Sequence, residues 1–277
     1  MKVFNASAKS DRRTRIKSNI VGTESFGNRE FTMSALNKPY VQVVNGRYGP
    51  CYVFKQDEYL GRSVINYGEY NKDECEYIVK LADSRPGLVL DIGANIGNIS
   101  QALIAAGHRV IAFEPQPEVF ELLELNCATA ECHNLALGAV KATMQMPAVD
   151  YSMSGNFGGL GIGLGTGLEV HVHTLDSFGL QDIGVMKIDV EGFEENVLRG
   201  AVETIRRCRP IIYLEADRME KLASLERFLD SLGYDFTPHT PPLFNPANFF
   251  GNTRNIWGKN FVSYNWDCRP GIRGLGD

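Results

Sequence analysis

The sequence has no apolar run approaching the ~20 residues that a membrane-spanning helix needs, so nothing in it predicts a membrane partner. It also has no basic surplus. With 28 Lys and Arg against 33 Asp and Glu, the net charge is −5, whereas nucleic-acid-binding domains usually carry a basic surface. No repeat or low-complexity tract stands out, apart from one glycine-rich stretch. These absences argue against a nucleic-acid or membrane partner, and the acids are spread along the chain, so the acid surplus says little about the substrate.

Signals for export or for a metal-binding cysteine site are also missing. The six cysteines include no C-x-x-C pair, and Cys127 and Cys132 are not spaced like zinc ligands. The N-terminus is basic but lacks the apolar core of a secretory signal. Nothing requires an oxidising compartment, so we expect a cytoplasmic protein.

The 277 residues suit one large domain with an appendage. Residues 1–40 are polar and weakly periodic, and we interpret them as an N-terminal extension, either a solvated tail or a docking arm. Residues 41–277 then form the main domain. It opens with two alternating, strand-like stretches and a helix, predicted at 73–83.

From Leu88 onward, short apolar runs alternate with amphipathic segments. This alternation predicts an α/β fold of the Rossmann-like kind, a parallel sheet with helices on both faces. Strands are predicted at 88–93, 109–114, 133–138, 185–190, 210–216, 234–240 and 260–266. Helices are predicted at 98–107, 117–130, 194–208 and 218–233.

In such sheets a ligand binds beyond the carboxyl ends of the strands. The informative residues are therefore those that follow each strand. They are Asp91 to Gly97, Glu114, Ala136 to Gly138, Asp189 to Gly192 and Glu215.

The stretch LVLDIGANIGNIS, residues 88–100, is typical of a strand, turn and helix that bind a nucleotide. A triphosphate loop would need a lysine after its last glycine, and none follows Gly97. A dinucleotide loop would need glycines at 93, 95 and 98, but the sequence has Gly93, Asn95 and Asn98. The side chains of the two asparagines would occupy space that a diphosphate needs. An NAD-dependent oxidoreductase stays open as an alternative.

Glu114 closes the second strand of the predicted sheet, where an acid can accept hydrogen bonds from both ribose hydroxyls. The helix that begins near Asn98 is free to bind a carboxylate at its N-terminus. Asp91 could face an ammonium group. Ribose with one amino acid and no diphosphate describes S-adenosylmethionine.

Three segments resemble the motif series of the FkbM family of S-adenosylmethionine-dependent methyltransferases: VLDIGANIGNIS, VIAFEPQPEVFELLELN and MKIDVEGFEENVLRGA with RPIIYLEAD. The resemblance covers about residues 61–216. It implies a class I methyltransferase fold, with a seven-stranded sheet whose last strand runs antiparallel. It also implies methyl transfer, usually to a hydroxyl. The residues expected at the cofactor are Asp91, Gly93, Ala94, Asn95, Gly97, Asn98, Glu114, Ala136 and Asp189.

We predict that Asp189 and Glu191 are catalytic, because a positioned carboxylate can remove the proton from an acceptor hydroxyl. They would share one face if their strand extends that far. Alternatively, Asp189 bonds to backbone or cofactor and Glu191 caps the next helix. A third possibility, which we do not favour, is that both carboxylates and Glu215 hold Mg²⁺.

The flanking segments leave further alternatives open. The glycine-rich residues 154–169 could form a lid over the site or only a hairpin turn. The aromatic-rich residues 245–270 could line the acceptor pocket or belong to the core, and Tyr67 and Glu69 could fold over the cofactor.

The family resemblance leaves the methyl acceptor open, because the family's substrates vary. We expect a hydroxyl of a sugar, a polyketide or a related metabolite. Methylation of a nitrogen in a peptide or small molecule, and a non-catalytic S-adenosylmethionine-binding protein, are the remaining alternatives.

Overall fold

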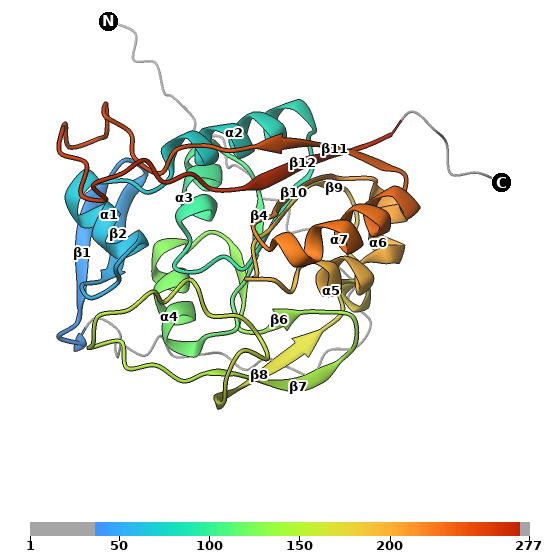
Figure 1. Cartoon of the computed structure of the whole chain (residues 1–277), viewed down its shortest axis with the longest axis horizontal. Helices are drawn as coiled ribbons and strands as arrows, with labels where there is room; N and C mark the ends of the chain where they lie inside the picture. Colours follow the sequence, from blue (N-terminus) through green and yellow to red (C-terminus); the bar gives the residue numbers. More distant parts are fainter. Residues whose placement is uncertain (1–36, 272–277) are drawn as a thin grey trace, which may run out of the picture. The chain divides into compact units, whose positions relative to one another are not determined.

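The computed structural model describes residues 37–271 and contains a central seven-stranded sheet (Figure 1). Its strands are β3 (Leu88–Ile92), β4 (Val110–Phe113), β5 (Glu131–His133), β9 (Ile183–Ile188), β10 (Ile211–Glu215), β11 (Tyr234–His239) and β12 (Asn265–Pro270). Their order across the sheet is β11-β12-β10-β9-β3-β4-β5. Only β12 is antiparallel, to β10 on one side and β11 on the other. The predicted mostly parallel sheet with an antiparallel last strand is confirmed.

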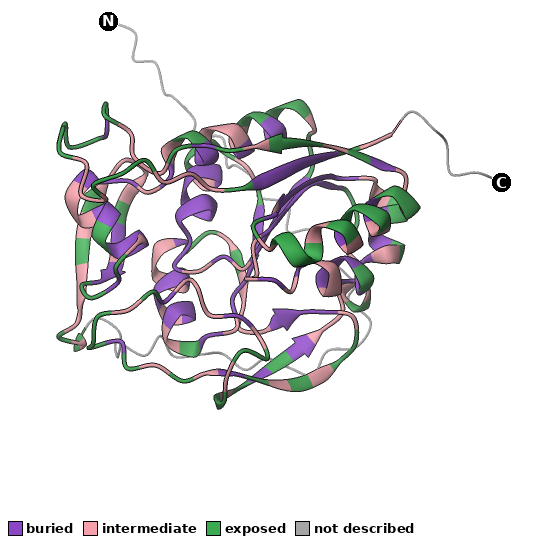
Figure 2. Cartoon of the chain, in the orientation of Figure 1, coloured by how far each residue is buried: buried purple, intermediate pink, exposed green. Residues whose placement is uncertain are grey.

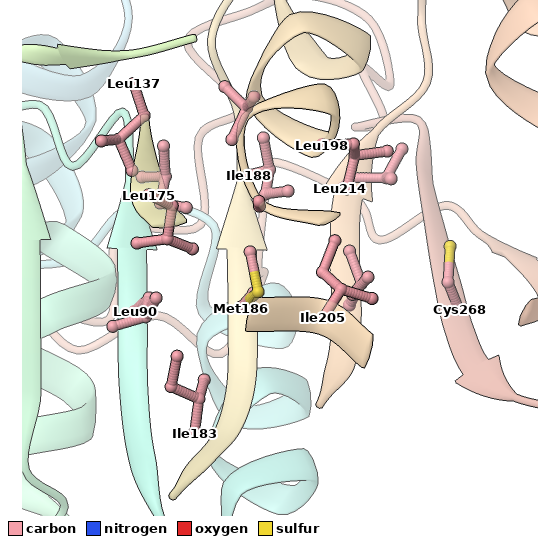
Figure 3. Packing of buried hydrophobic residues seen from close by; sticks show 14 of the residues in the cluster. Leu90, Leu137, Leu175, Ile183, Met186, Ile188, Leu198, Ile205, Leu214 and Cys268 are labelled. Atoms are coloured by element: carbon pink, nitrogen blue, oxygen red, sulfur yellow. The ribbon is translucent and has the colours of Figure 1, made fainter. Parts of the chain in front are cut away.

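Helices cover both faces of the sheet, as predicted. One face carries α2 (Lys72–Ser84), α3 (Asn98–Ala105) and α4 (Pro117–Asn126), and the other carries α5 (Glu194–Arg199), α6 (Val202–Cys208) and α7 (Met219–Ser231). Successive strand residues point to opposite faces, so Val89 packs under α2 and α3 while Leu90 joins the cluster under α5, α6 and α7. Figure 2 shows the strands buried between the helices, and Figure 3 shows Leu90, Met186 and Leu198 in that second cluster.

Two small sheets and a helix complete the described chain. The elements outside the central sheet are β1 (Val41–Gly46), β2 (Gly49–Phe54), α1 (Leu60–Tyr67), β6 (Ala136–Leu137), β7 (Ala142–Pro147), β8 (Gly167–His173) and the short 3₁₀-helix η2 (Leu175–Phe178). The hairpin β1-β2 forms one sheet, and β6-β8-β7 forms the other.

The predicted strand at 133–138 is wrong, because the chain leaves the central sheet at its start. The third strand is β5, which ends at His133. The Asn134 side chain then donates to the carbonyl oxygens of Glu114 and Pro115, at 2.9 and 3.1 Å. These bonds turn the chain, and Ala136 pairs with β8 in the three-stranded sheet instead.

The single helix predicted at 194–208 is also wrong, because it is divided into α5 and α6 at Gly200. A Cβ atom on Gly200 would lie 1.9 Å from the carbonyl oxygen of Gly138. The helix therefore approaches the chain before β7 so closely that only glycine fits.

The last strand lies further along the chain than the predicted 260–266. Only Asn265 and Trp266 of that range belong to β12, which continues to Pro270. This register buries Trp266 and Cys268 in the cluster under α5, α6 and α7, which gives the strand its apolar contacts.

The folded chain includes the last residues of the expected N-terminal extension. Lys38 forms ion pairs with Glu118 and Glu121 of α4, at 3.0 and 2.9 Å. The rest of that extension, residues 1–36, lies outside the described residues. Within residues 37–271, no helix is both long enough and apolar enough to cross a membrane. The cytoplasmic location stays a prediction.

Candidate active site

Strand register aligns the ends of four neighbouring strands at one edge of the central sheet. Ile92 of β3 lies opposite both Phe113 of β4 and Ile188 of β9, and Ile188 lies opposite Leu214 of β10. The residues that follow these four are Gly93, Glu114, Asp189 and Glu215, and all of them line one cavity of about 190 Å³. The predicted ligand position, beyond the carboxyl ends of the strands, is therefore where the structure has its cavity.

The turn after β3 is shaped by close backbone contacts. A Cβ atom on Gly93 would lie 1.8 Å from the carbonyl oxygen of Asp189, so a side chain has no room there. Gly93 also has a φ of 74°, and Asn95 has a φ of 50°, both in the left-handed region. Gly93, Ala94, Asn95 and Asn98 line the cavity, as predicted for cofactor contacts.

Gly97 does not line the cavity, and its expected contact with the cofactor stays a prediction. A Cβ atom there would lie 2.5 Å from the Cys127 sulfur and 2.9 Å from Leu123. Gly97 therefore allows α3 to pack closely against α4.

Glu114 follows β4 and is buried at the cavity wall. Its Oε2 accepts a hydrogen bond from the backbone N–H of Asn95 at 3.0 Å, and its Oε1 accepts one from Gln116 at 2.9 Å. Burial raises the pKa of Glu114 to about 7, although these two N–H groups act in the opposite direction. Each carboxylate oxygen keeps a further lone pair that can accept a hydrogen bond from a hydroxyl group.

The wall beside Glu114 is largely apolar. Ala136, predicted at the cofactor, lies on it next to the side chains of Phe113, Leu135, Leu137 and Met146. A flat aromatic base suits such a surface, with a carboxylate beside it for the attached ribose.

Asp91 does not line the cavity either, so the prediction that it faces the ligand is not supported. Its side chain is fully buried, and it accepts a 2.6 Å hydrogen bond from the Ser100 hydroxyl. Its Oδ1 lies 3.2 Å from the Lys187 ammonium. Lys187 also donates to the carbonyl oxygen of Gly93 at 2.9 Å, and its Nζ lies 3.7 Å from Asp189. Asp91 and Lys187 thus hold β3, the turn after it and the end of β9 together.

Three carboxyl side chains lie close together beyond the ends of β9 and β10, namely Asp189, Glu191 and Glu215. Each offers an oxygen within 4.8 Å of the others. The strand β9 ends at Ile188, so the expected shared strand face does not exist. Instead, Glu191 has a φ of 56°, and the resulting turn brings its side chain back to the cavity.

Glu191 does not cap the following helix. Within the described chain, no side-chain hydrogen bond caps α5, whose N-cap residue is Phe193. The Oε1 of Glu194 instead accepts hydrogen bonds from the backbone N–H groups of Gly192 and Val190 in the turn before the helix, at 2.9 and 3.3 Å. Glu191 instead forms an ion pair with Arg218, which precedes α7. The side chain of Glu191 lines the cavity while it makes this ion pair.

Burial and crowding change the acidity of two of these carboxyls. Burial, with the charge of Asp189, raises the pKa of Glu191 to about 7, while Arg218 opposes the rise. Burial, with the charges of Asp189 and Glu191, raises the pKa of Glu215 to about 11. At neutral pH Glu215 keeps its proton, whereas Glu191 is poised to gain or lose one.

The glycine-rich segment contributes to the cavity wall through Asn156, Gly158, Leu160 and Ile162, which favours the lid over a remote turn. From the aromatic-rich tail only Ser263 lines it.

Tyr67 and Glu69 do not fold over the cavity. Tyr67 is buried and donates to the carbonyl oxygen of Arg254, and Glu69 binds Arg47 and Asn245. Both residues hold the tail against α1.

The sequence analysis did not predict one part of the cavity wall. It is formed by residues just before α2 and in its first turn, namely Tyr70, Asn71 and Glu74. Glu74 lies on the apolar face of this helix, one turn before Ile78, and an acid in that position could have been recognised as unusual. Burial is the largest cause that raises the pKa of Glu74 to about 8, and the charge of Asp189 adds to the rise.

Comparison with protein families assigns the chain to a known group. The profile of the methyltransferase FkbM domain matches residues 91–236, which is more than half of the chain and contains the strand ends described above. The chain belongs to the FkbM methyltransferase family. The resemblance of its motifs to this family is thereby confirmed, and methyl transfer is favoured over the nicotinamide-dependent alternative.

Solved structures of several methyltransferases are similar to the chain at low identity. An FkbM methyltransferase from Methylobacillus flagellatus KT is 17% identical, with a TM-score of 0.44 over 65% of this chain and 43% of that one. A tRNA (uracil-54, C5)-methyltransferase from Pyrococcus abyssi, in complex with S-adenosyl-L-homocysteine, is 11% identical, with a TM-score of 0.49 over 83% and 44%. The chain thus spans less than half the length of either protein. A comparison with curated proteins finds no match.

Proposed function

We propose that this protein transfers the methyl group of S-adenosylmethionine to a hydroxyl oxygen of a small molecule. The observation that carries the proposal is the pair of carboxylates in one cavity. Glu114 lies beside an apolar wall at the end of β4, and Glu191 lies two strands away at the end of β9. The first suits an adenosine, and the second suits proton removal from an acceptor.

The charges of the cavity fit S-adenosylmethionine better than a dinucleotide. Among the described residues, Lys187 is the only lysine or arginine on the cavity wall, and it is paired with Asp91. A diphosphate would therefore meet no free cation. The cofactor supplies a methyl group that is already activated on a positively charged sulfur, a charge that surrounding carboxylates tolerate.

The remaining task of the protein is to align the acceptor and to remove its proton. We propose that the Glu191 carboxylate removes the proton of the acceptor hydroxyl, because its pKa of about 7 matches the working range of a general base. As the hydroxyl oxygen bonded to the methyl carbon, the carbon–sulfur bond would break and release S-adenosylhomocysteine, and the hydroxyl proton would pass to Glu191. Asp189, held 3.7 Å from the Lys187 ammonium, stays beside it as a second acceptor for the hydroxyl hydrogen.

A screen for methyl gain tests this proposal. The purified protein is incubated with S-adenosylmethionine and a panel of sugars, polyketide alcohols and amines. The masses of the products are then measured by mass spectrometry. We expect an alcohol to gain one methyl group while S-adenosylhomocysteine forms. Methylation of a nitrogen instead would move the assignment to the N-methyltransferase alternative. Tight cofactor binding without transfer to any acceptor would identify a non-catalytic binding protein.

A further inference from the structure

The cavity carries far more acid than base. Six carboxyl side chains line it, namely Asp57, Glu74, Glu114, Asp189, Glu191 and Glu215. The cations near it are already used. Lys187 pairs with Asp91 behind the wall, and Arg218 pairs with Glu191 and with Asp217, the latter at 3.3 Å. Among the described residues, carboxyl groups on the cavity wall therefore outnumber the cations that pair with them.

Two buried oxygens on this wall have no hydrogen-bond partner. Asn71 is only 4% exposed, and its Oδ1 is unpaired, as is the Oε2 of Glu215. Asn71 lines the cavity beside Glu74, to which its amide nitrogen is hydrogen-bonded. An unpaired buried amide oxygen is costly, so Asn71 calls for a ligand that donates a hydrogen bond, and the Glu215 carboxyl beside this site can accept one when it is ionised.

We infer that the methyl acceptor is a cationic amino alcohol, in which a protonated amine accompanies the hydroxyl that is methylated. This inference rests on the proposed methyl transfer. The ammonium group would lie between Glu74, Asp189 and Glu215 and donate to them and to Asn71. An ammonium is the donor-only, positively charged group that such a surface recognises.

The acidity of these carboxyls supports the assignment. Burial and neighbouring charge raise the pKa of Glu74 to about 8 and that of Glu215 to about 11, so each holds a proton when no cation is near. A bound ammonium would take the place of such a proton. A phosphorylated or carboxylated acceptor would place a further negative charge beside these carboxyls, so an anionic acceptor is disfavoured.

The cofactor's own ammonium could satisfy part of this surface, so the test is made with the cofactor site filled. Binding of S-adenosylhomocysteine is measured first, because its absence would defeat the proposed function itself. Glucosamine, N-acetylglucosamine and glucosamine 6-phosphate are then titrated into the saturated protein and followed by ligand-observed NMR. The three probes share one hydroxylated ring and differ in charge.

We expect glucosamine to bind at least about tenfold more tightly than N-acetylglucosamine, and the phosphate to bind most weakly. Glu74→Gln and Glu215→Gln should each reduce that preference several-fold while S-adenosylhomocysteine still binds. Glu203→Gln, on the exposed start of α6, is the matched control and should leave it unchanged. Equal binding of the three probes, tighter binding of the phosphate, or no binding of glucosamine at millimolar concentration would overturn the inference and leave the methyl transfer proposal standing.

Discussion

Lys187 and Asp91 form a buried ion pair beneath the cavity, with Nζ 3.2 Å from Oδ1. Lys187 is 5% exposed and Asp91 is fully buried, and they face each other across neighbouring strands β9 and β3. Lys187 also reaches the carbonyl oxygen of Gly93. The pair therefore ties the turn after β3 to the strand that leads to Asp189 and Glu191.

Removal of either partner should destabilise the protein strongly. Lys187→Met leaves the Asp91 charge buried without a partner, and we expect a loss of about 3–5 kcal/mol in the free energy of unfolding. The double variant with Asp91→Asn should lose less than the sum of the two single variants. Urea denaturation measures all three. Additive losses would show that the two charges do not interact.

Turnover should depend on the ionisation of Glu191. Because its pKa is raised to about 7 and a base must be unprotonated, kcat should fall tenfold per pH unit below about pH 7 and level off above it. Glu191→Gln should lower kcat by about 10²–10⁴ and abolish that limb. Arg218→Gln should move the limb to higher pH, because Arg218 holds the pKa down. A profile that does not move in the Arg218 variant would remove Glu191 from the mechanism.

Gly200 should not tolerate even one methyl group. Gly200→Ala would place a carbon 1.9 Å from the Gly138 oxygen, and we expect a cost of about 3 kcal/mol or more, since the contact is with backbone. Gly107 is the matched control. It has a φ of 92° and no atom within 4 Å of its added carbon, so Gly107→Ala should cost only about 1–2 kcal/mol of backbone strain. Equal losses in urea denaturation would contradict the close approach of Gly200.

Turnover should not need a divalent metal. Asp189, Glu191 and Glu215 lie close enough to share an ion, but Glu191 is already paired with Arg218. Pre-treatment with a chelator should therefore leave the rate of methyl transfer unchanged. A loss that Mg²⁺ restores would instead assign these three carboxylates to a metal.

The sheet and its site edge could be predicted because they depend on local patterns. Buried strands need continuous apolar runs, and parallel strands bring the residues that follow them to one edge. Gly93, Glu114 and Asp189 could therefore be assigned to one cavity from sequence alone. The role of Asp91 in a buried ion pair could not be predicted, since it depends on Lys187, which lies opposite on another strand.

Other errors share this dependence on distant contacts. The break at Gly200 is imposed by Gly138, and the departure of the chain after His133 is fixed by bonds from Asn134 to the end of β4. Neither partner is near in sequence. Glu74 is different, because the sequence alone places it on the apolar face of a predicted helix, so it could have been recognised as a buried acid but was missed.

Calorimetric titration with S-adenosylhomocysteine tests the central claim that the cavity binds S-adenosylmethionine through Glu114. The wild-type protein should bind it with one site and show no heat with NAD. Glu114→Gln should weaken binding by about 10–100-fold, because about 1.5–3 kcal/mol of charged hydrogen bonding to the ribose is lost. Binding of NAD in this cavity, or unchanged affinity in a folded Glu114→Gln protein, would contradict the account.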